Sequence, residues 1–190
     1  VHSAETDAEI HVDAAFKAQI PPLSAEEREQ LEANIVAHGC RDPLTTWNGI
    51  LLDGHNRHEI CTRLGLPFKL VSVELPNREA AEDWIDGNQL GRRNLTPDAF
   101  KLLLGRRYLR RKRAAHRPPK GDQFDPLIQP GKTAAKLAVE YGTSEATVKR
   151  AARFAAEVER TPELLAAIAE GRPVLPVMRE LNERKREARR

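Results

Sequence analysis

A short polar segment, LDGHNRHEICTRLG at residues 52–65, carries the side chains best suited to bind or transform a phosphate. Where a helix begins directly after a glycine, several backbone N–H groups and the positive end of the helix dipole meet, which is the usual basis of an anion site. Gly54 is in that position, and His55 and Asn56 follow it. Arg57, one turn into the helix, would add a planar guanidinium that matches phosphate oxygens. The segment therefore predicts a phosphate site.

Two residues of this segment are candidates for catalysis. Asp53 could hold a divalent cation or orient a nucleophile, and His55 could donate to a phosphate or accept a proton. A plainer interpretation is that Asp53 only caps the helix while Arg57 pairs with a nearby acid. The segment alone leaves both interpretations open.

A second segment, TAAKLAVEYGTSEATVKRAARF at residues 133–154, is typical of a helix-turn-helix. Gly142 would supply the positive φ of the tight turn, Ala138 is small where the two helices touch, and Ser144 is placed to cap the second helix. A helix lying in the major groove reaches base edges and phosphates with its outer face. The same pattern also fits a helical hairpin in an unrelated bundle. The residues expected to contact DNA here are Thr143, Ser144, Glu145, Thr147, Lys149, Arg150 and Arg153.

A long basic helix is expected before this segment. Thr96 and Pro97 form a typical helix start, and apolar residues recur after them at helical spacing. The remaining surface carries almost only positive charge, whereas a solvated helix face usually carries both signs. We expect this helix to contact DNA phosphates. The candidate residues are Arg106, Arg110 and Arg113.

Charge is distributed unevenly along the chain. The net charge is +3 overall, but residues 1–91 carry −9 and residues 92–190 carry +12. Such a split indicates two regions with different partners, of which the second would meet a polyanion. Double-stranded DNA is the obvious candidate. The acidic half could alternatively be a protein-docking module.

The first half is expected to form a compact α+β domain. Ser24 and Glu27 form a capping box, and Asn48-Gly49 is a strong hairpin signal between two short strands. The predicted helices cover residues 24–38, 55–64 and 79–91, and the predicted strands 44–47, 50–52 and 68–75. The last part is expected to be all-helical, after a proline- and glycine-rich linker. These patterns predict an α+β domain at 1–95, a basic helix and linker at 96–130, and a helix-turn-helix domain at 131–190.

Composition argues against several classes of protein. No run approaches the roughly 20 apolar residues that span a bilayer, and the polar start of the sequence does not resemble a secretory signal. Cys40 and Cys61 are too few for a disulfide framework and lack metal-binding spacing. We therefore expect buried reduced thiols, no metal site, no membrane partner and a cytoplasmic location.

Taken together, several segments resemble a known family. They are LSAEEREQLEANIVAHGCRDPLTTW, ILLDGHNRHEICTRLGLPFKLVSVEL, NQLGRRNLTP, the helix-turn-helix and PELLAAIAEGRPVLPVMREL. They look like the ParB/sulfiredoxin-fold domain and following helices of ParB-like chromosome and plasmid partition proteins. The resemblance extends over residues 16–181, which is nearly the whole chain.

The resemblance implies an α+β ParB/sulfiredoxin-like domain followed by an all-α helix-turn-helix domain. It also implies a DNA-binding protein of plasmid, phage or chromosome partition or of transcriptional regulation. Members of the family bind CTP with Mg²⁺ at a Gly-x-x-Arg turn, which Gly54 and Arg57 match. A homodimer, weak CTP hydrolysis, a ParA-type ATPase partner and a nucleoid- or plasmid-associated location are implied as well. The implied nucleotide-binding residues are Gly54, His55, Asn56, Arg57, Asn88, Gln89, Arg92 and Arg93.

One feature of the turn supports a different activity. Partition proteins usually have Gly-Glu-Arg-Arg here, whereas the sequence DGHNR is closer to the Asp-Gly-His-His-Arg turn of a related free-serine kinase. The alternative is therefore a phosphate-chemistry enzyme of the same fold, kinase-like or a nuclease, that uses Asp53 and His55. A nuclease needs a cluster of acidic metal ligands, and only Asp53 stands near the turn in sequence.

Overall fold

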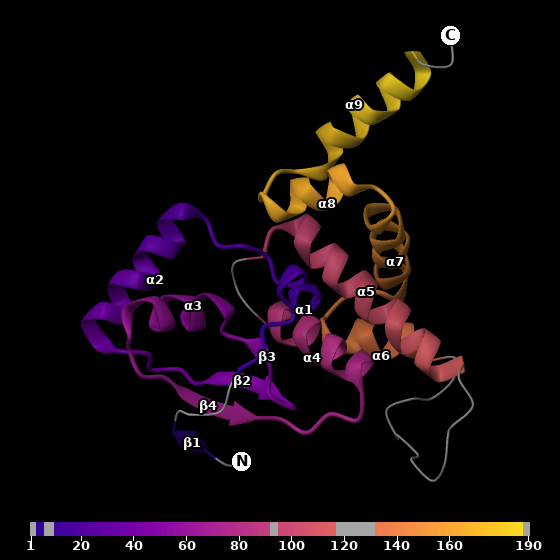
Figure 1. The fold of residues 1–190 in the computed structure, drawn as a ribbon. Coiled ribbons are helices and arrows are strands. Elements are labelled where there is room, and N and C mark those ends of the chain that lie inside the picture. The colour runs from indigo at the N-terminus through magenta and orange to yellow at the C-terminus, as the bar shows by residue number, and fades with distance from the viewer. Residues whose placement is uncertain (1–2, 6–9, 92–94, 117–131, 188–190) are drawn as a thin grey trace. The chain divides into compact units, whose positions relative to one another are not determined.

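The computed structural model describes residues 3–5, 10–91, 95–116 and 132–187 (Figure 1). The chain divides into two compact units, residues 1–85 and 86–190. The first is α+β and the second is all-helical in its described residues. The division lies inside one helix, whereas the sequence placed the boundary after residue 95. The reason is that the end of this helix, from Asp86 onward, packs within the second unit.

The first unit is built on a mixed sheet whose strand order is β1-β4-β2-β3. The strands are β1 (Ser3–Glu5), β2 (Leu44–Trp47), β3 (Ile50–Asp53) and β4 (Lys69–Ser72). β2 and β3 form the predicted antiparallel hairpin, and both turn residues, Asn48 and Gly49, have positive φ. β4 runs parallel to β2 and is shorter than the predicted strand.

Helices of the first unit cover the sheet (Figure 1). They are α1 (Ala14–Gln19), α2 (Ala25–His38), α3 (His55–Leu64) and the first part of α4 (Arg78–Leu90). Leu51 and Leu52 alternate in direction, so each faces a different cluster. Leu52 packs with Phe16 of α1 and Ile85 of α4. Leu51 packs with other strand residues, next to a cluster that joins α2 and α3.

The ends of α2 and α3 are fixed by residues that the sequence indicates. Ser24 and Glu27 form the predicted capping box at the start of α2, with both reciprocal hydrogen bonds present. α3 ends at Gly65, whose left-handed conformation and N–H group close the helix. Cys40 and Cys61 are both free thiols. Cys61 is buried, as expected, while Cys40 is only partly buried.

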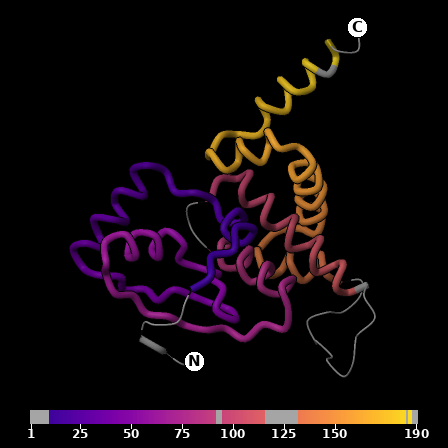
Figure 2. The backbone as a smooth tube through the Cα atoms, viewed as in Figure 1, coloured from indigo at the N-terminus to yellow at the C-terminus, as the bar shows by residue number. Residues whose placement is uncertain are grey.

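The second unit consists of helices that pack around α5 and α7. After α4 come α5 (Pro97–His116), α6 (Thr133–Glu140), α7 (Glu145–Glu159), α8 (Pro162–Ala169) and α9 (Val174–Glu187). α5 and α7 lie side by side (Figures 1 and 2). Gly105 allows this close approach, because a Cβ atom there would lie 2.2 Å from the carbonyl oxygen of Ala151. No helix in the described part of the chain is long and apolar enough to cross a membrane.

Candidate functional site

The turn between β3 and α3 requires glycine. Gly54 has φ 92° and ψ 23°, a left-handed conformation that other residues adopt only at a cost. A Cβ atom at Gly54 would also lie 2.5 Å from Leu44 Cδ2. Since Gly54 is the N-cap and has no side chain, no side-chain oxygen of the described residues accepts a hydrogen bond from the first backbone N–H groups of α3. The sequence prediction of an open helix start is confirmed, and Asp53 does not cap the helix.

His55, the first residue of α3, is buried with no hydrogen-bond partner in the described part of the chain. Its side chain is only 6% exposed, and neither ring nitrogen is paired. Burial lowers the pKa of His55 to about 4, although Asp53 opposes this shift. The imidazole is therefore neutral at neutral pH and presents one N–H donor and one acceptor. An unsatisfied buried ring of this kind costs free energy unless a ligand or water completes it.

Arg57 lies over the same turn. Its Nη2 is 3.2 Å from Asp53 Oδ2 and donates to the carbonyl oxygen of Pro43, also at 3.2 Å. Its Nε is buried and has no partner among the described residues. The pairing of Arg57 with an acid is thus present, as the plainer interpretation expected. The Nε–H group of the guanidinium is nevertheless left without an acceptor in the described part of the chain.

The other residues implied to bind nucleotide are distributed as follows. Asn56 is partly exposed in the first turn of α3. Asn88 and Gln89 belong to the second unit, in the last turns of α4, where Gln89 is 2% exposed. Arg92 and Arg93 lie outside the described residues. Sequence reasoning missed Lys17, whose Nζ is 4.0 Å from Glu59 Oε2 on α3. A lone lysine in a short helix gives no local signal of this proximity.

α6 and α7 form the helical hairpin that the sequence predicts. Gly142 has φ 59° in the turn, and Leu137, Ala138 and Val148 are buried in the small core. Ser144 caps α7 by accepting a hydrogen bond from the N–H of Thr147 at 3.1 Å. The hairpin core also includes Leu103 and Leu104 of α5.

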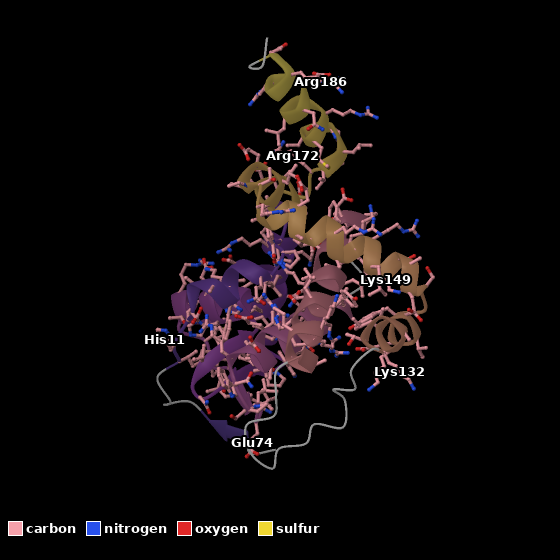
Figure 3. All side chains as sticks on the ribbon, turned by 90° about the vertical axis from the view of Figure 1, so that its right-hand side faces the viewer. His11, Glu74, Lys132, Lys149, Arg172 and Arg186 are labelled. Atoms are coloured by element: carbon pink, nitrogen blue, oxygen red, sulfur yellow. The ribbon has the colours of Figure 1, made fainter. Side chains whose placement is uncertain are left out.

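One side of α7 is apolar and buried, and the other is polar and exposed. The buried side contains Val148, Ala151, Ala152, Ala155 and Val158. The exposed side contains Ser144, Glu145, Lys149, Arg150 and Arg153. Thr143 and Thr147 are partly exposed. We call the residues from Thr143 to Arg153 that are predicted to contact DNA the α7 outer face, and Lys149 is labelled there in Figure 3.

Two of the positively charged side chains on the α7 outer face make local contacts with other residues of α7 in the described part of the chain. Lys149 Nζ is 3.2 Å from Glu145 Oε2, and Arg150 Nη2 donates to Thr147 Oγ1 at 3.1 Å. Both members of the Lys149 pair are about half exposed, and exposed pairs contribute little to stability. These side chains can therefore exchange their partners for phosphate oxygens.

The arginines of α5 differ from the prediction of a phosphate-binding face. Arg110 is 7% exposed and pairs with fully buried Asp86 of α4 at 2.7 Å. Arg106 is largely covered and pairs with Glu159 of α7 at 2.9 Å. Arg113 is exposed. The structure therefore does not support Arg110 as a DNA contact, because its guanidinium joins α4 to α5.

Arg107 serves a similar packing role beside the hairpin. It pairs with Glu140 at the end of α6 at 2.9 Å and lies over the ring of Tyr141, with its Cζ 5.7 Å from the ring centroid. It also hydrogen bonds to the Tyr141 hydroxyl. Burial raises the pKa of Tyr141 to about 12, so this hydroxyl stays protonated. Arg107 thus fixes the position of the turn before α7.

Comparison with known proteins gives a fold. No protein-family model and no curated protein matches the chain. Two solved structures of a pNOB8-like ParB N-domain are similar to it. The first has a TM-score of 0.58 at 20% identity, with 89% of this chain and 75% of that chain covered. The second has a TM-score of 0.56 at 19% identity, with 88% and 68% covered. The chain therefore has the fold of a ParB N-domain.

Proposed function

We propose that this protein is a ParB-like DNA-binding protein that contacts duplex DNA with the α7 outer face. The observation that supports this most directly is the arrangement of α7 itself. Lys149, Arg150 and Arg153 are exposed on one side of a helix whose other side is buried. The shared fold and the net charge of +12 in residues 92–190 agree with a polyanionic partner.

The proposal includes a second site for a phosphate group of a nucleotide at the Gly54 turn. Three kinds of donor have no acceptor among the described residues: the first N–H groups of α3, the ring of His55 and Nε of Arg57. Unpaired donors around a helix N-terminus favour an anion. By analogy with ParB-like proteins, we propose CTP with Mg²⁺ as the ligand and a homodimer as the active state. A ParA-type ATPase is the proposed partner, with a role in partition or transcription.

DNA binding is tested by fluorescence polarisation with a mixed-sequence duplex over a salt series. Affinity should fall steeply with salt, with a logarithmic slope of about 0.9 for each phosphate contact. Lys149→Ala and Arg150→Ala should each weaken binding, by about 1–3 kcal/mol where the side chain reads a base. An affinity that hardly changes with salt would contradict the proposal.

Arg160→Ala is the matched control for these variants. Arg160 follows the last residue of the same helix, is well exposed and pairs locally with Glu157 at 3.4 Å. The Arg160→Ala substitution also removes one positive charge, but at the opposite end of α7 and outside the α7 outer face. Equal losses for Arg160→Ala and Arg150→Ala would indicate a general charge effect and would argue against a defined DNA-binding face.

The nucleotide site is tested by calorimetry with CTP, ATP and GTP in the presence of Mg²⁺. His55→Phe should reduce binding, because it removes the ring donor while keeping a planar aromatic ring at this position. Incubation with radiolabelled nucleotide, serine and DNA separates this site from the enzymatic alternative. Phosphate transfer or strand cleavage that is lost in Asp53→Ala would favour the enzyme.

A further inference from the structure

The charges at the Gly54 turn almost cancel before a ligand arrives. The His55 imidazole is neutral at neutral pH, and the charge of Arg57 is opposed by Asp53 at 3.2 Å. The α3 dipole contributes only about half a positive charge. A nucleoside triphosphate keeps a net negative charge even when one Mg²⁺ is bound to it, so a further cation near the turn would strengthen its binding.

Helix α1 is anchored beside this turn. Phe16 is fully buried with Leu52 of β3. Asp13 caps α1 and accepts two hydrogen bonds from Arg78, at 2.7 and 3.0 Å. Arg78 also lies over the Phe16 ring, with its Cζ 4.3 Å from the ring centroid. These contacts fix the backbone of α1 and therefore the position from which Lys17 extends.

Lys17 lies next to the first turns of α3. Its Nζ is 4.0 Å from Glu59 Oε2, and Glu59 is four residues after His55, on the same side of the helix. The positive charge of Lys17 also acts on the His55 ring. Glu59 has a closer partner, because Arg28 Nη2 is 2.5 Å from Glu59 Oε1. Lys17 can therefore leave Glu59 without leaving that carboxylate unpaired.

We propose that Lys17 is the second cation of the phosphate site and moves from Glu59 to the terminal phosphates of a ligand bound at the Gly54 turn. Its side chain is 55% exposed and its four-carbon stem is flexible, so this movement needs no change in the backbone. The geometry selects a chain of phosphates, with one phosphate at the α3 N-terminus and the next within reach of Lys17. The inference rests on the proposed phosphate site.

The test is calorimetry on the full chain with three probes: CTP with Mg²⁺, inorganic tripolyphosphate and inorganic phosphate. Lys17→Gln should weaken CTP and tripolyphosphate binding about tenfold, as expected for the loss of a charge-assisted hydrogen bond. Inorganic phosphate should bind this variant as it binds the wild type. Lys17→Arg should restore binding of the longer probes, because it keeps a cation on a long stem.

Lys69→Gln is the matched control, because Lys69 is an exposed lysine on β4 of the same unit. It should bind all three probes like the wild type. Thermal unfolding without ligand should be the same for all variants, so that a loss of binding is not a loss of folding.

Different outcomes separate the two proposals. Absence of binding of every probe to the wild type would overturn the phosphate site and with it the role of Lys17. Wild-type binding that is unchanged in Lys17→Gln would overturn only the role of Lys17. Equal weakening in Lys69→Gln and Lys17→Gln would also overturn it, because the effect would then be that of general surface charge.

Discussion

Both the backbone conformation and the packing at position 54 require glycine. Gly54→Ala should destabilise the first unit by about 2–4 kcal/mol, since an alanine would have a left-handed backbone and a Cβ atom 2.5 Å from Leu44 Cδ2. The same change should abolish phosphate binding, because relief of the contact must move the start of α3. Urea unfolding followed by tryptophan fluorescence measures the first effect and calorimetry the second.

Gly65→Ala is the control at the other end of α3. Gly65 is also left-handed, with φ 63°, but apart from its chain neighbours no atom of the described residues lies within 4 Å of a Cβ atom there. Only the conformational cost of about 1 kcal/mol remains. Equal destabilisation by the two variants would show that the contact with Leu44 has no effect.

The burial of His55 predicts a pH dependence of stability. The unfolded state has an ordinary histidine pKa near 6.5, and burial lowers the pKa in the folded state to about 4. Between these pH values the unfolded state binds more protons, so the free energy of unfolding decreases as pH falls. The titration of His55 should lower the free energy of unfolding by about 3 kcal/mol at pH 4 and should have no effect on it above pH 7. Burial also lowers the pKa of His58, which acts in the same direction.

His55→Phe separates this contribution from the other titrations. Urea unfolding of both proteins at pH 7 and at pH 4.5 gives the difference directly. The variant should lose less stability over this range than the wild type. An equal loss in both would place the acid sensitivity elsewhere, for example in the ion pairs of carboxylates such as Asp13.

At the scale of elements, the sequence predicts the helix ends and turns whose structure depends on residues close to one another in the chain. The capping box of Ser24 and Glu27 located α2, and Asn48-Gly49 located the hairpin. The length of β4 was not predictable in this way. β4 ends at Ser72 because its ladder with β2 pairs residues only as far as Thr46 and Ser72. The Gly54 turn could be predicted because its conformation depends on adjacent residues.

The basic surface of α5 could not be interpreted from its own sequence. The acids that pair with Arg106 and Arg110 lie 53 and 24 residues away. Charge counted along a helix does not show which neighbours supply the opposite sign after folding. A buried pair such as that of Arg110 and Asp86 is strongly destabilising to break, because the remaining charge stays uncompensated. These arginines therefore hold the second unit together.

Gly105→Ala should destabilise the second unit. The added Cβ atom would lie 2.2 Å from the Ala151 carbonyl oxygen and 2.7 Å from Ala155 Cβ, so α5 and α7 would have to separate. The overpacking cost of about 1–3 kcal/mol should exceed the helix-propensity gain of about 1 kcal/mol. Thermal unfolding followed by circular dichroism measures the change.

Gly91→Ala provides the comparison for Gly105. The nearest atom to a Cβ at Gly91 is a carbonyl oxygen at 3.5 Å, which is an ordinary contact. Gly91→Ala should be close to neutral in stability. A stabilised Gly105→Ala variant would mean that the two helices separate at little cost, and the close approach would then be unimportant.

At the scale of the whole molecule, the two units differ in charge, in architecture and in their spectroscopic probes. Both tryptophans, Trp47 and Trp84, belong to the first unit. Trp47 is held by a hydrogen bond from its Nε1 to the carbonyl oxygen of Leu75 at 2.8 Å. The second unit has no tryptophan and is all-helical in its described residues. Tryptophan fluorescence therefore reports on the first unit, and helical circular dichroism reports mainly on the second.

Ligands for the two proposed sites should act on different probes. CTP with Mg²⁺ at about one hundred times its Kd should stabilise the first unit by about 2.7 kcal/mol and raise the midpoint of the fluorescence transition. Duplex DNA should raise the midpoint of the circular dichroism transition, because the α7 outer face belongs to the second unit. DNA that raised only the fluorescence midpoint would contradict the assignment of DNA binding to α7. In the Arg150→Ala variant, DNA should raise the midpoint of the circular dichroism transition by less. CTP should raise the midpoint of the fluorescence transition as in the wild type, since Arg150 and the Gly54 turn belong to different units.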